Sequence, residues 1–347
     1  MGRIAKIARR TFLVGAAAIA GGVAFGYYQY KKPVKNPLKD SLAEGEATFN
    51  PYVKIGSDGK ITIIAPRAEM GQGIMTTLAA LVAEELEVGL DQVTVEHGPA
   101  SAAYFNSAVM SENAPFAPWE HSAFKDGFRS VMGAFGKIVA LQITGGSTST
   151  VDAFDKMRHA GALALEMLKA AAAKELGVDI STLKAERGAI IEPASGKSLT
   201  FGQLALKAAD IEPPTDIKLK DRKDWKLLGK SQPRVDMRAK VTGAPIFGID
   251  VTLPDMVYGT VKMNPRLGGR MKSYDASKAQ AMPGVIKVVE IECQFGHGLG
   301  VIADNTWTAF QAADAITVEW GDAPYPADTA GIMGVIDAAL AAGGGSA

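Results

Sequence analysis

The sequence has almost no cysteine, since Cys293 is the only one among 347 residues. A single cysteine excludes a disulfide within the chain, and it excludes an iron–sulfur cluster or zinc finger held by cysteines of this polypeptide. The histidines also lack the spacing that places two metal ligands on one helical face; they are His97, His121, His159 and His297. We therefore predict no metal-binding side chain, and any redox centre must be bound by other groups.

Net charge is absent as well, because 37 basic residues balance 37 acidic ones. Without a basic field, the chain does not resemble a nucleic-acid-binding protein, and we expect no nucleic acid partner. A hydrophobic content of 47% and a charged content of 21% are typical of globular proteins. A chain of this length can fill two cores, so we expect two folded domains.

Residues 1–45 are predicted to be a targeting segment and a linker. Arg9 and Arg10 precede an uncharged stretch over residues 11–30, which resembles a twin-arginine export signal. A transmembrane anchor with basic residues on its inner side explains the same charge asymmetry. Both interpretations place the rest of the chain on the periplasmic side of the inner membrane, and the second leaves it anchored by residues 11–30.

A glycine-flanked glutamine, Gln72, stands between a strand-like run over residues 61–64 and a helix-like run over residues 76–87. The two glycines let the backbone bend sharply and approach a ligand, and the helix start offers unpaired N–H groups to an anion. A turn that merely connects the strand to the helix is the alternative interpretation. A nicotinamide-type site is not supported, because position 76 is Thr and the GxGxxG pattern is incomplete.

A second glycine turn, Gly145 and Gly146, is followed by four hydroxyl residues over 147–150 and opens a predicted helix over residues 151–176. Hydroxyls at a helix start serve as an N-cap, and the same groups can hold an anion. The cap alone would account for the pattern. Two glycine turns that each open a helix in one predicted domain favour a ligand site.

The remaining pattern predicts structural roles. Residues 52–55 and 60–64 form a predicted hairpin, and residues 101–138 are predicted to be irregular, as a lid, an interface or a weakly ordered insertion. Residues 211–232 are predicted to be a polar connection between domains. Acids near the end of the first helix are predicted to be solvated; they are Glu84, Glu85 and Glu87. Ser195 to Ser198 has the end of a phosphate-loop motif but lacks its first glycine, so it is predicted to be a hairpin turn.

Beyond residue 255, strand-like runs alternate with helical ones. Strands are predicted over residues 256–263, 285–291, 299–303 and 316–320, and helices over residues 277–282 and 306–313. Asp304 and Asn305 are predicted to be turn or capping residues. Nothing in this half supplies a nucleophile, a base or a set of metal ligands, so its predicted role is structural.

Three segments together resemble the large, molybdopterin-binding subunit of the xanthine dehydrogenase family: residues 69–73, 83–86 and 144–149. The resemblance is to the type called isoquinoline 1-oxidoreductase β-subunit or membrane-bound aldehyde dehydrogenase, which carries a twin-arginine leader. Residues 233–236, 240–250, 281–285 and 301–307 resemble the hammerhead domain that follows in that type. The resemblance implies an α+β protein, with part of a molybdopterin-binding domain over 46–212, an aldehyde oxidase/xanthine dehydrogenase α/β hammerhead domain over 213–325 and a tail over 326–347.

This resemblance also implies a cofactor and its contacts. The cofactor would be molybdopterin with molybdenum, in its cytosine dinucleotide form, used to oxidise an N-heterocycle or aldehyde with water as the oxygen source. The family positions near the cofactor fall on Met70, Gly71, Gln72, Gly73, Gly145, Gly146, Ser147, Thr148 and Ser149. The family's catalytic base is a glutamate in a glycine-rich stretch near the C-terminus of the full subunit, and this sequence has no such stretch. We therefore predict no catalytic residue within this chain.

Two functional interpretations follow. In the first, the chain is the N-terminal part of a molybdenum hydroxylase large subunit, active together with a complementary polypeptide that carries the rest of the cofactor site. Its electron acceptors would be a small [2Fe–2S] subunit and a c-type cytochrome, because this chain cannot carry clusters. In the second, it is a non-catalytic exported binding or scaffold module, or the remnant of a truncated reading frame.

Overall fold

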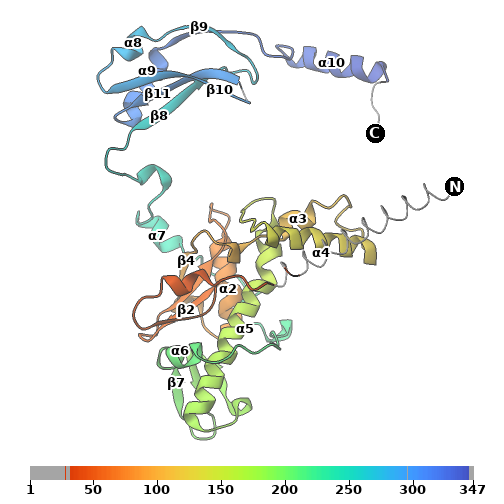
Figure 1. Ribbon diagram of the computed structural model, residues 1–347, viewed down its shortest axis with the longest axis vertical. Helices are drawn as coiled ribbons and strands as arrows, with labels where there is room; N and C mark the ends of the chain where they lie inside the picture. The colour runs from red at the N-terminus through yellow and green to blue at the C-terminus, as the bar shows by residue number, and fades with distance from the viewer. Residues whose placement is uncertain (1–27, 29–31, 295, 344–347) are drawn as a thin grey trace, which may run out of the picture. The chain divides into compact units, whose positions relative to one another are not determined.

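A computed structural model of the chain describes Tyr28, residues 32–294 and residues 296–343. The chain divides into two compact units, Met1–Pro245 and Ile246–Ala347 (Figure 1). Both units combine helices with sheets, which confirms the α+β prediction. The predicted leader or anchor over residues 11–30 lies outside the described residues, apart from Tyr28. In the described part of the chain, no helix has both the length and the apolar character needed to cross a bilayer.

The first unit is built on a four-stranded sheet of β1 (Glu46–Asn50), β2 (Val53–Gly56), β3 (Ile61–Ala65) and β4 (Val93–His97), in that order. The predicted hairpin is confirmed, because β2 and β3 pair antiparallel with Ile55 opposite Ile61. β3 and β4 pair in parallel, which requires a crossover. Helix α2 (Ile74–Leu86) provides it, so the Gln72 loop leaves the carboxyl end of β3.

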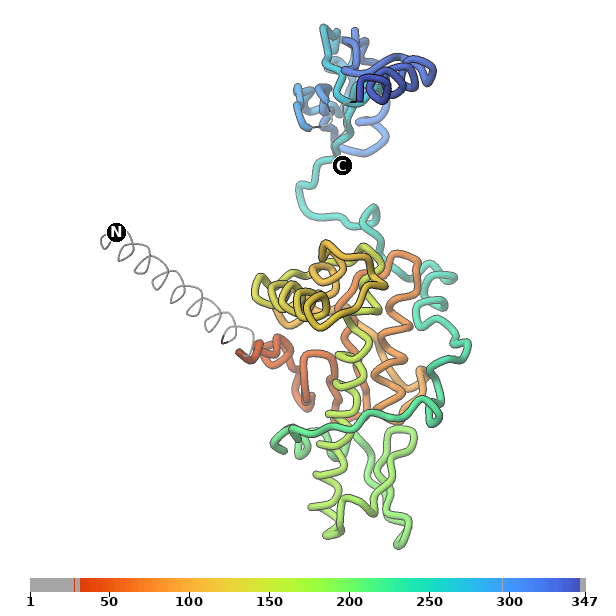
Figure 2. The backbone as a smooth tube through the Cα atoms, turned by 90° about the vertical axis from the view of Figure 1, so that its right-hand side faces the viewer, coloured from red at the N-terminus to blue at the C-terminus, as the bar shows by residue number. Residues whose placement is uncertain are grey.

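Helix α5 (Thr148–Leu176) packs along α2, and the two lie side by side in both views (Figures 1 and 2). It confirms the helix predicted over residues 151–176 and begins three residues earlier. Gly161 allows the close approach, because a Cβ atom there would lie 2.5 Å from the Val82 carbonyl oxygen. Leu78, Leu81, Met157 and Leu168 are fully buried where these helices meet the core.

Residues 101–138 are more regular than predicted, and the prediction of an irregular segment was wrong. They contain α3 (Ala108–Glu112) and the 16-residue helix α4 (Ala123–Ile138). Glycines, which are poor helix formers, obscured the helical pattern in the sequence. Gly133 and Gly136 are the buried residues of α4, and Gly136 lies against Asn106, where a Cβ atom would be 3.1 Å from the carbonyl oxygen. These glycines therefore let α4 pack closely on α3.

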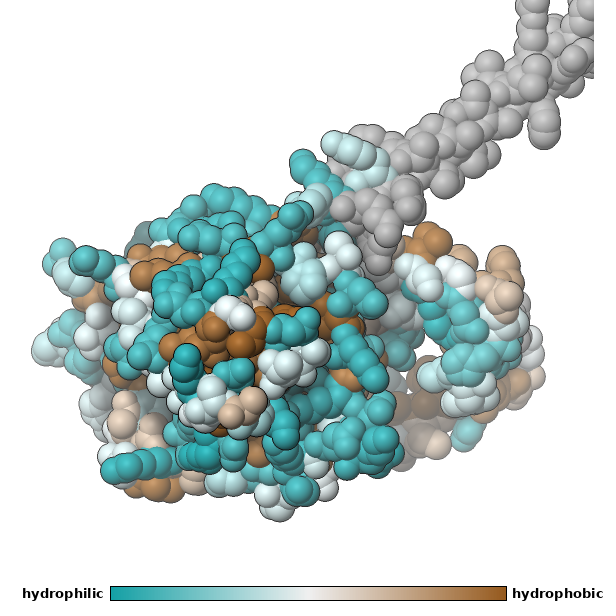
Figure 3. Space-filling model, turned by 90° about the horizontal axis from the view of Figure 1, so that it is seen from below, coloured by the Kyte–Doolittle hydropathy of each residue, from teal (hydrophilic) through white to brown (hydrophobic). Residues whose placement is uncertain are grey.

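At the far end of α5 lies a small antiparallel sheet of β5 (Lys184–Glu186), β6 (Ala189–Ile191) and β7 (Ser198–Thr200), followed by α6 (Phe201–Ala209). The chain turns back between β6 and β7 through residues 192–197, which confirms that the Ser195–Ser198 motif belongs to a hairpin turn. Seen from this end, the surface mixes hydrophilic side chains with a central group of apolar ones (Figure 3). Short helix α7 (Met237–Val241) closes the unit.

The second unit contains two sheets. One has the order β10 (Val285–Cys293), β11 (Gly296–Ala303), β8 (Tyr258–Met263), and the other pairs β12 (Thr317–Trp320) with β9 (Met271–Asp275). Its helices are α8 (Ser277–Gln280), α9 (Thr306–Ala315) and α10 (Thr329–Ala341). The predicted strands and helices are present, and Asn305 caps α9 as expected. The sequence did not indicate β9, most of whose residues are exposed, or α10, which buries none.

Short 3₁₀ helices connect these elements: η1 (Pro37–Asp40), η2 (Leu90–Gln92), η3 (Ala102–Tyr104), η4 (Ile180–Thr182), η5 (Arg222–Asp224) and η6 (Gly248–Asp250). The core of the first unit is much larger than that of the second, which is a small cluster that includes Ala279, Leu299, Val301 and Ala312. The units divide after Pro245. The predicted domain limits at residues 212 and 325 stay predictions.

Candidate functional site

The two glycine turns predicted from the sequence meet at one pocket of the first unit, with a volume of about 310 Å³. The backbone N–H of Ala68 donates to Thr144 Oγ1 at 2.9 Å, which joins one loop directly to the other. The pocket has a neutral lining without a charged side chain: Met70, Gln72, Ile74, Thr77, Thr144, Gly145, Ser147, Ser149 and Thr150. The fold therefore brings together segments more than seventy positions apart in the chain.

The other predicted site residues shape the loops without lining the pocket. Gly71, Gly73 and Gly146 have φ values of +100°, +87° and +61°, which favour glycine. Thr148 is buried, and its hydroxyl donates to the carbonyl oxygen of Gly145 at 2.8 Å. The hydroxyl also accepts a hydrogen bond from Asn106 at 2.9 Å. These four residues set the backbone path on which the lining residues lie.

The start of α2 is capped by the loop itself. Glu69 accepts hydrogen bonds from the backbone N–H groups of Gly71, Gly73 and Met75 at 2.8, 3.1 and 3.1 Å. Burial alone would raise the pKa of Glu69, but these N–H groups and the Arg234 guanidinium hold the pKa below its ordinary value. Glu69 therefore already accepts from Gly73 and Met75 at this helix start, and an anion would find only the N–H groups that Glu69 leaves unused.

Gln72 also turns toward its own loop. Its Oε1 accepts from the Met70 N–H at 2.6 Å, and its Nε2 donates to the Ala68 carbonyl oxygen at 2.9 Å. The side chain nevertheless lines the pocket and is exposed. One amide N–H remains available to a ligand, since the Nε2 group carries two.

The start of α5 differs from the start of α2. Ser147, at the N-cap position, has a left-handed backbone with φ of +58°, and its side chain makes no capping bond. The sequence predicted that a hydroxyl side chain caps this helix, and this prediction is wrong for Ser147. Within the described part of the chain, the Ser149 and Thr150 N–H groups have no hydrogen-bond acceptor. Their N–H groups and hydroxyls are free to bind an anion in the pocket.

A buried ionic cluster lies next to the pocket and joins its two sides. Asp152, on the first turn of α5, accepts from Arg67, which precedes the Gln72 loop, and from the Ser107 N–H and hydroxyl at 2.7 and 2.6 Å. Lys156 Nζ lies 2.7 Å from the same carboxylate. Burial raises the pKa of Asp152, but Lys156, Ser107 and Arg67 together hold it below its usual range. Asp152 is therefore held in its charged form inside the fold, paired with Arg67 and Lys156.

Asn106 performs a similar task for the α5 loop. The side chain is fully buried, and its Nδ2 donates to the Ile143 carbonyl oxygen at 3.1 Å and to Thr148 at 2.9 Å. Its backbone N–H donates to the Leu141 carbonyl oxygen at 2.6 Å. Asn106 thereby joins the start of the α3–α4 segment to its end and holds the residues that lead into the second glycine turn.

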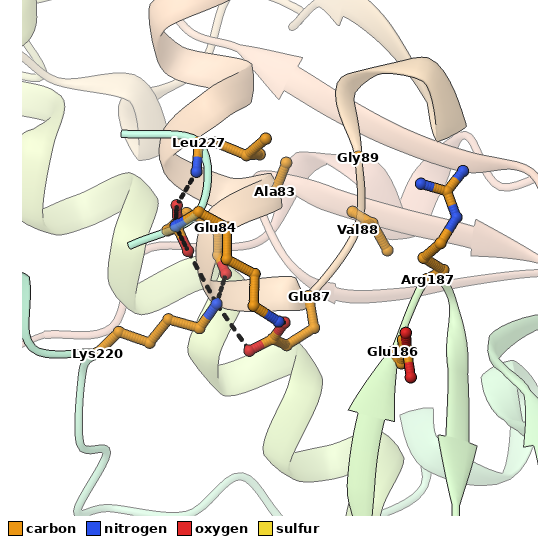
Figure 4. Close-up of a pocket in the computed structure, with 10 residues that line it drawn as sticks. Ala83, Glu84, Glu87, Val88, Gly89, Glu186, Arg187, Lys220 and Leu227 are labelled. Carbon is orange, nitrogen blue, oxygen red and sulfur yellow. Dashed lines mark hydrogen bonds and ion pairs between the residues drawn. The ribbon is translucent and has the colours of Figure 1, made fainter. Parts of the chain in front are cut away.

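A second pocket, of about 260 Å³, lies at the opposite end of α2 (Figure 4). Here Glu84 accepts from Lys220 Nζ at 2.9 Å and from the N–H groups of Lys226, Leu227 and Leu228 at 2.9, 2.6 and 3.1 Å. These bonds offset the effect of burial and lower the pKa of Glu84. The prediction that this acid is solvated was wrong, because its side chain anchors the connecting segment.

Glu85 was also predicted to be solvated, and it is buried too. It forms an ion pair with Arg158 of α5 at 2.7 Å. It also accepts from the Lys220 N–H at 3.0 Å. The segment over residues 211–232 is therefore fastened to the first unit by the acids of α2, rather than a free polar connection.

The sequence did not indicate three residues that organise the pocket: Arg67, Asn106 and Asp152. The longest-range hydrogen bond of each of these residues joins positions 42 to 85 apart, so no local pattern marks them. Glu69 lies inside the motif that carried the resemblance, but its capping role depends on the backbone path of the loop. Across the described residues, no cluster of acids, histidines or cysteines could hold a metal ion.

Comparison with known families decides the classification. A family model of the molybdopterin cofactor-binding domain matches residues 10–116, which include the Gln72 loop. The chain is also 28% identical to the beta subunit of isoquinoline 1-oxidoreductase from Brevundimonas diminuta, over 91% of this chain and 40% of that protein. These matches support the molybdopterin-binding subunits of the xanthine dehydrogenase family as the relatives of this chain.

Two further relatives agree with this family. The membrane-bound aldehyde dehydrogenase [pyrroloquinoline-quinone] of Gluconacetobacter polyoxogenes is 28% identical over 91% of this chain and 37% of that protein. A nicotinate dehydrogenase subunit from Pseudomonas putida is 29% identical over 83% of this chain and 22% of that protein. The chain thus spans 40% or less of the length of these three relatives.

Proposed function

We propose that this chain forms one side of the cofactor site in a molybdenum hydroxylase that oxidises an N-heterocycle or an aldehyde with oxygen from water. The observation that carries this proposal is the meeting of the two glycine turns at one neutral pocket. The names of the relatives support the substrate classes, since they refer to isoquinoline, aldehyde and nicotinate.

The pocket suits a polyanionic pterin nucleotide. The group would meet no carboxylate in the lining, because Glu69 faces the backbone N–H groups and Arg234 instead. A Cβ atom added to Gly71 or Gly145 would meet no atom within 4 Å, so the backbone is open on the sides where a ligand would approach. We infer that the phosphates of the cytosine dinucleotide form bind at the start of α5, with the Ser149 and Thr150 N–H groups and hydroxyls as donors.

In this arrangement the residues of this chain bind and orient the cofactor. Gln72 and the backbone of the Met70–Gly73 loop would contact the pterin side, and Gly145 to Ser149 would contact its polar and phosphate atoms. The bound group itself supplies the two-electron redox chemistry at molybdenum. Since the pocket lining of this chain holds no acid or histidine, the proton transfer of the reaction would need a base from elsewhere in the assembled enzyme.

Partner subunits are part of the proposal. Two of the relatives are themselves named as subunits of larger enzymes. We propose that a complementary polypeptide supplies the rest of the cofactor site, and that a small [2Fe–2S] subunit and a c-type cytochrome accept the electrons. The chain cannot bind such clusters through cysteine, since it contains only Cys293.

A quinone cofactor is the main competing possibility, because the name of one relative includes pyrroloquinoline quinone. The family model describes a molybdopterin site instead, and it covers the Gln72 loop. A non-catalytic binding or scaffold module remains the second candidate function, favoured by the lack of an acid or base in the pocket lining.

Metal and nucleotide analysis of the purified complex tests the proposal. The chain is co-expressed with a polypeptide equivalent to the rest of its relatives' length, and bound molybdenum and released cytosine nucleotide are measured. We expect close to one of each per complex, and at least a tenfold loss in Gly145→Val, whose side chain enters the pocket. Gly127→Val is the matched control, because Gly127 is an exposed position on α4 with nothing within 4 Å. A complex without molybdenum would overturn the proposal, and bound quinone would identify the competitor.

We also propose that the protein works on the periplasmic side of the inner membrane after export by the twin-arginine route, with residues 11–30 retained as an anchor. The support is the Arg9–Arg10 pair and the uncharged stretch after it. Replacing both arginines with lysine should retain the protein in the cytoplasm, as judged by fractionation. A mature N-terminus well beyond Tyr30 would contradict the anchor.

A further inference from the structure

A segment over residues 220–236, here called the strap, runs along α2 from its C-terminal end to its N-terminal end. Figure 2 shows it in teal beside α2 in orange. At the first end, Glu84 holds the strap through Lys220 and the Leu227 N–H (Figure 4). The N–H groups of Lys226 and Leu228, on either side of Leu227, donate to the same carboxylate. At the second end, the Val235 N–H donates to Thr76 Oγ1 at 3.1 Å.

Arg234 makes the contact between the strap and the Gln72 loop. Its Nη1 donates to the Gly71 carbonyl oxygen at 2.8 Å, and its Nη2 donates to Glu69 Oε1 at 3.0 Å. The side chains are largely shielded, at 28% exposure for Arg234 and 6% for Glu69. One guanidinium group therefore contacts both a carbonyl group of the loop and the carboxylate that caps the loop.

Asp236 sets the direction of this guanidinium group. It accepts from Arg234 Nε at 3.0 Å and from Nη2 at 2.8 Å, and this two-point pairing orients the planar group. Lys240 also contacts Asp236 at 2.5 Å. The guanidinium has five N–H donors in a rigid fork, whereas a lysine ammonium could not reach Gly71, Glu69 and Asp236 with the same geometry.

The Arg234 contact matters because Glu69 both caps the start of α2 and pairs with Arg234. Its Oε1 accepts from Gly71, Gly73 and Arg234, and its Oε2 accepts from Met75. Without Arg234, a shielded carboxylate would lose its cationic partner and the Gly71 carbonyl group would lose its donor. The loop would then depend only on its own internal hydrogen bonds, although Met70 and Gln72 line the pocket.

We propose that Arg234 is a positioning residue for the pocket: through it, the segment that leads into the second unit fixes the Gln72 loop in the geometry that holds the cofactor. The consequence for the cofactor rests on the proposed function. The effect on the loop does not, because it follows from contacts within this chain.

Hydrogen exchange of the loop amides, followed by mass spectrometry on the co-expressed complex, tests the proposal. In Arg234→Met we expect exchange at Gly71, Gly73 and Met75 to be at least tenfold faster than in the unaltered protein. Amides inside α2, from Leu78 to Leu86, should keep their protection and serve as the internal reference. Arg234→Lys should give an intermediate result, because it retains the charge without the fork.

Arg238→Met is the matched control. Arg238 is an exposed arginine on α7 whose side chain makes no ion pair in the described structure. Exchange of the loop should be unchanged in this variant. Cofactor retention, measured as molybdenum lost during dialysis, should fall in Arg234→Met and stay constant in Arg238→Met.

Two results would overturn the proposal. One is unchanged exchange at Gly71, Gly73 and Met75 in Arg234→Met, and the other is faster loop exchange with full cofactor retention. If Arg234→Met does not fold, Arg234→Lys and Glu69→Gln test the same contact. If the unaltered complex binds no molybdenum, the proposed function fails, while the exchange data still decide whether Arg234 positions the loop.

Discussion

The two helix starts that border the pocket look alike in sequence and differ in structure. Each follows a glycine turn, and each begins a helix that packs against the other. At the start of α2, the Glu69 carboxylate accepts from the Gly73 and Met75 N–H groups and pairs with Arg234. The start of α5 has no side-chain cap, and its loop is held from the side by Asn106 and by the Ala68–Thr144 bond.

This difference gives the pocket two unlike walls. A helix start carries a partial positive charge, which attracts an anion when its N–H groups are free. At α2 that charge is already balanced by Glu69, whereas at α5 it remains available near Ser149 and Thr150. We therefore expect the anionic part of a bound cofactor on the α5 side and its neutral ring system on the α2 side.

The largest effect should come from the cluster that joins the two walls. Asp152→Asn leaves Arg67, with 1% of its side chain exposed, without a carboxylate partner inside the fold. Removing one member of a buried ion pair costs about 3–5 kcal/mol. We expect the free energy of unfolding of the first unit to fall by that amount in urea titrations, with the helical signal as the observable.

Asp155→Asn is the control for this change, because Asp155 lies on the same helix and is exposed. It should alter stability by less than about 0.5 kcal/mol. Equal stability of the two variants would mean that the Asp152 cluster does not hold the two walls together.

Replacing glycines should lower stability by a smaller amount, and the loss should be larger in the first glycine turn than in the second. Gly73→Ala places a side chain at φ of +87° where no atom lies within 4 Å, so the cost is backbone strain alone. That strain is about 1–2 kcal/mol for an L-residue. Gly145→Ala has equal space and no positive φ, so we expect less than about 0.5 kcal/mol. Thermal unfolding of both variants measures the difference, and equal losses would contradict the assigned backbone geometry.

Much of this fold could be predicted from local patterns. The hairpin of β2 and β3, the helix α5 and the strands of the second unit follow from alternation, helical periodicity and turn residues. Helix α4 could not be predicted in this way, because its buried positions are Gly133 and Gly136, and glycine weakens the helical pattern. Only the packing against Asn106 and Ser107 explains why glycine is needed there.

The two turns of the pocket could be predicted because each is formed by residues that are neighbours in the sequence. Glycines and hydroxyls marked the turns, and the resemblance to a family related one turn to the other. The burial and the partners of the charged side chains could not be predicted in the same way. Glu84 and Glu85 stand at the end of a helix, where acids are usually solvated, and their burial depends on a strap 135 to 144 positions later. The same holds for Glu69, whose cationic partner lies 165 positions away.

The smallest expected effect concerns this last pair and depends on pH. The pKa of Glu69 is lower in the folded chain than in the unfolded one, so its stabilisation is fully present above the ordinary glutamate pKa of about 4.3 and is lost as the pH falls through the lowered value. Glu69→Gln removes this ionisation. We expect it to cost about 1 kcal/mol at pH 7, the usual worth of a helix cap, and the stability gap between the two proteins should narrow in urea titrations as the pH falls through the lowered pKa of Glu69. Because the start of α5 has no such acid, Ser147→Ala should show no pH-dependent gap in the same range. A stability gap for Glu69→Gln that did not change as the pH was lowered through the acid range would show that the carboxylate charge plays no part in the cap, and the two helix starts would then be electrostatically alike.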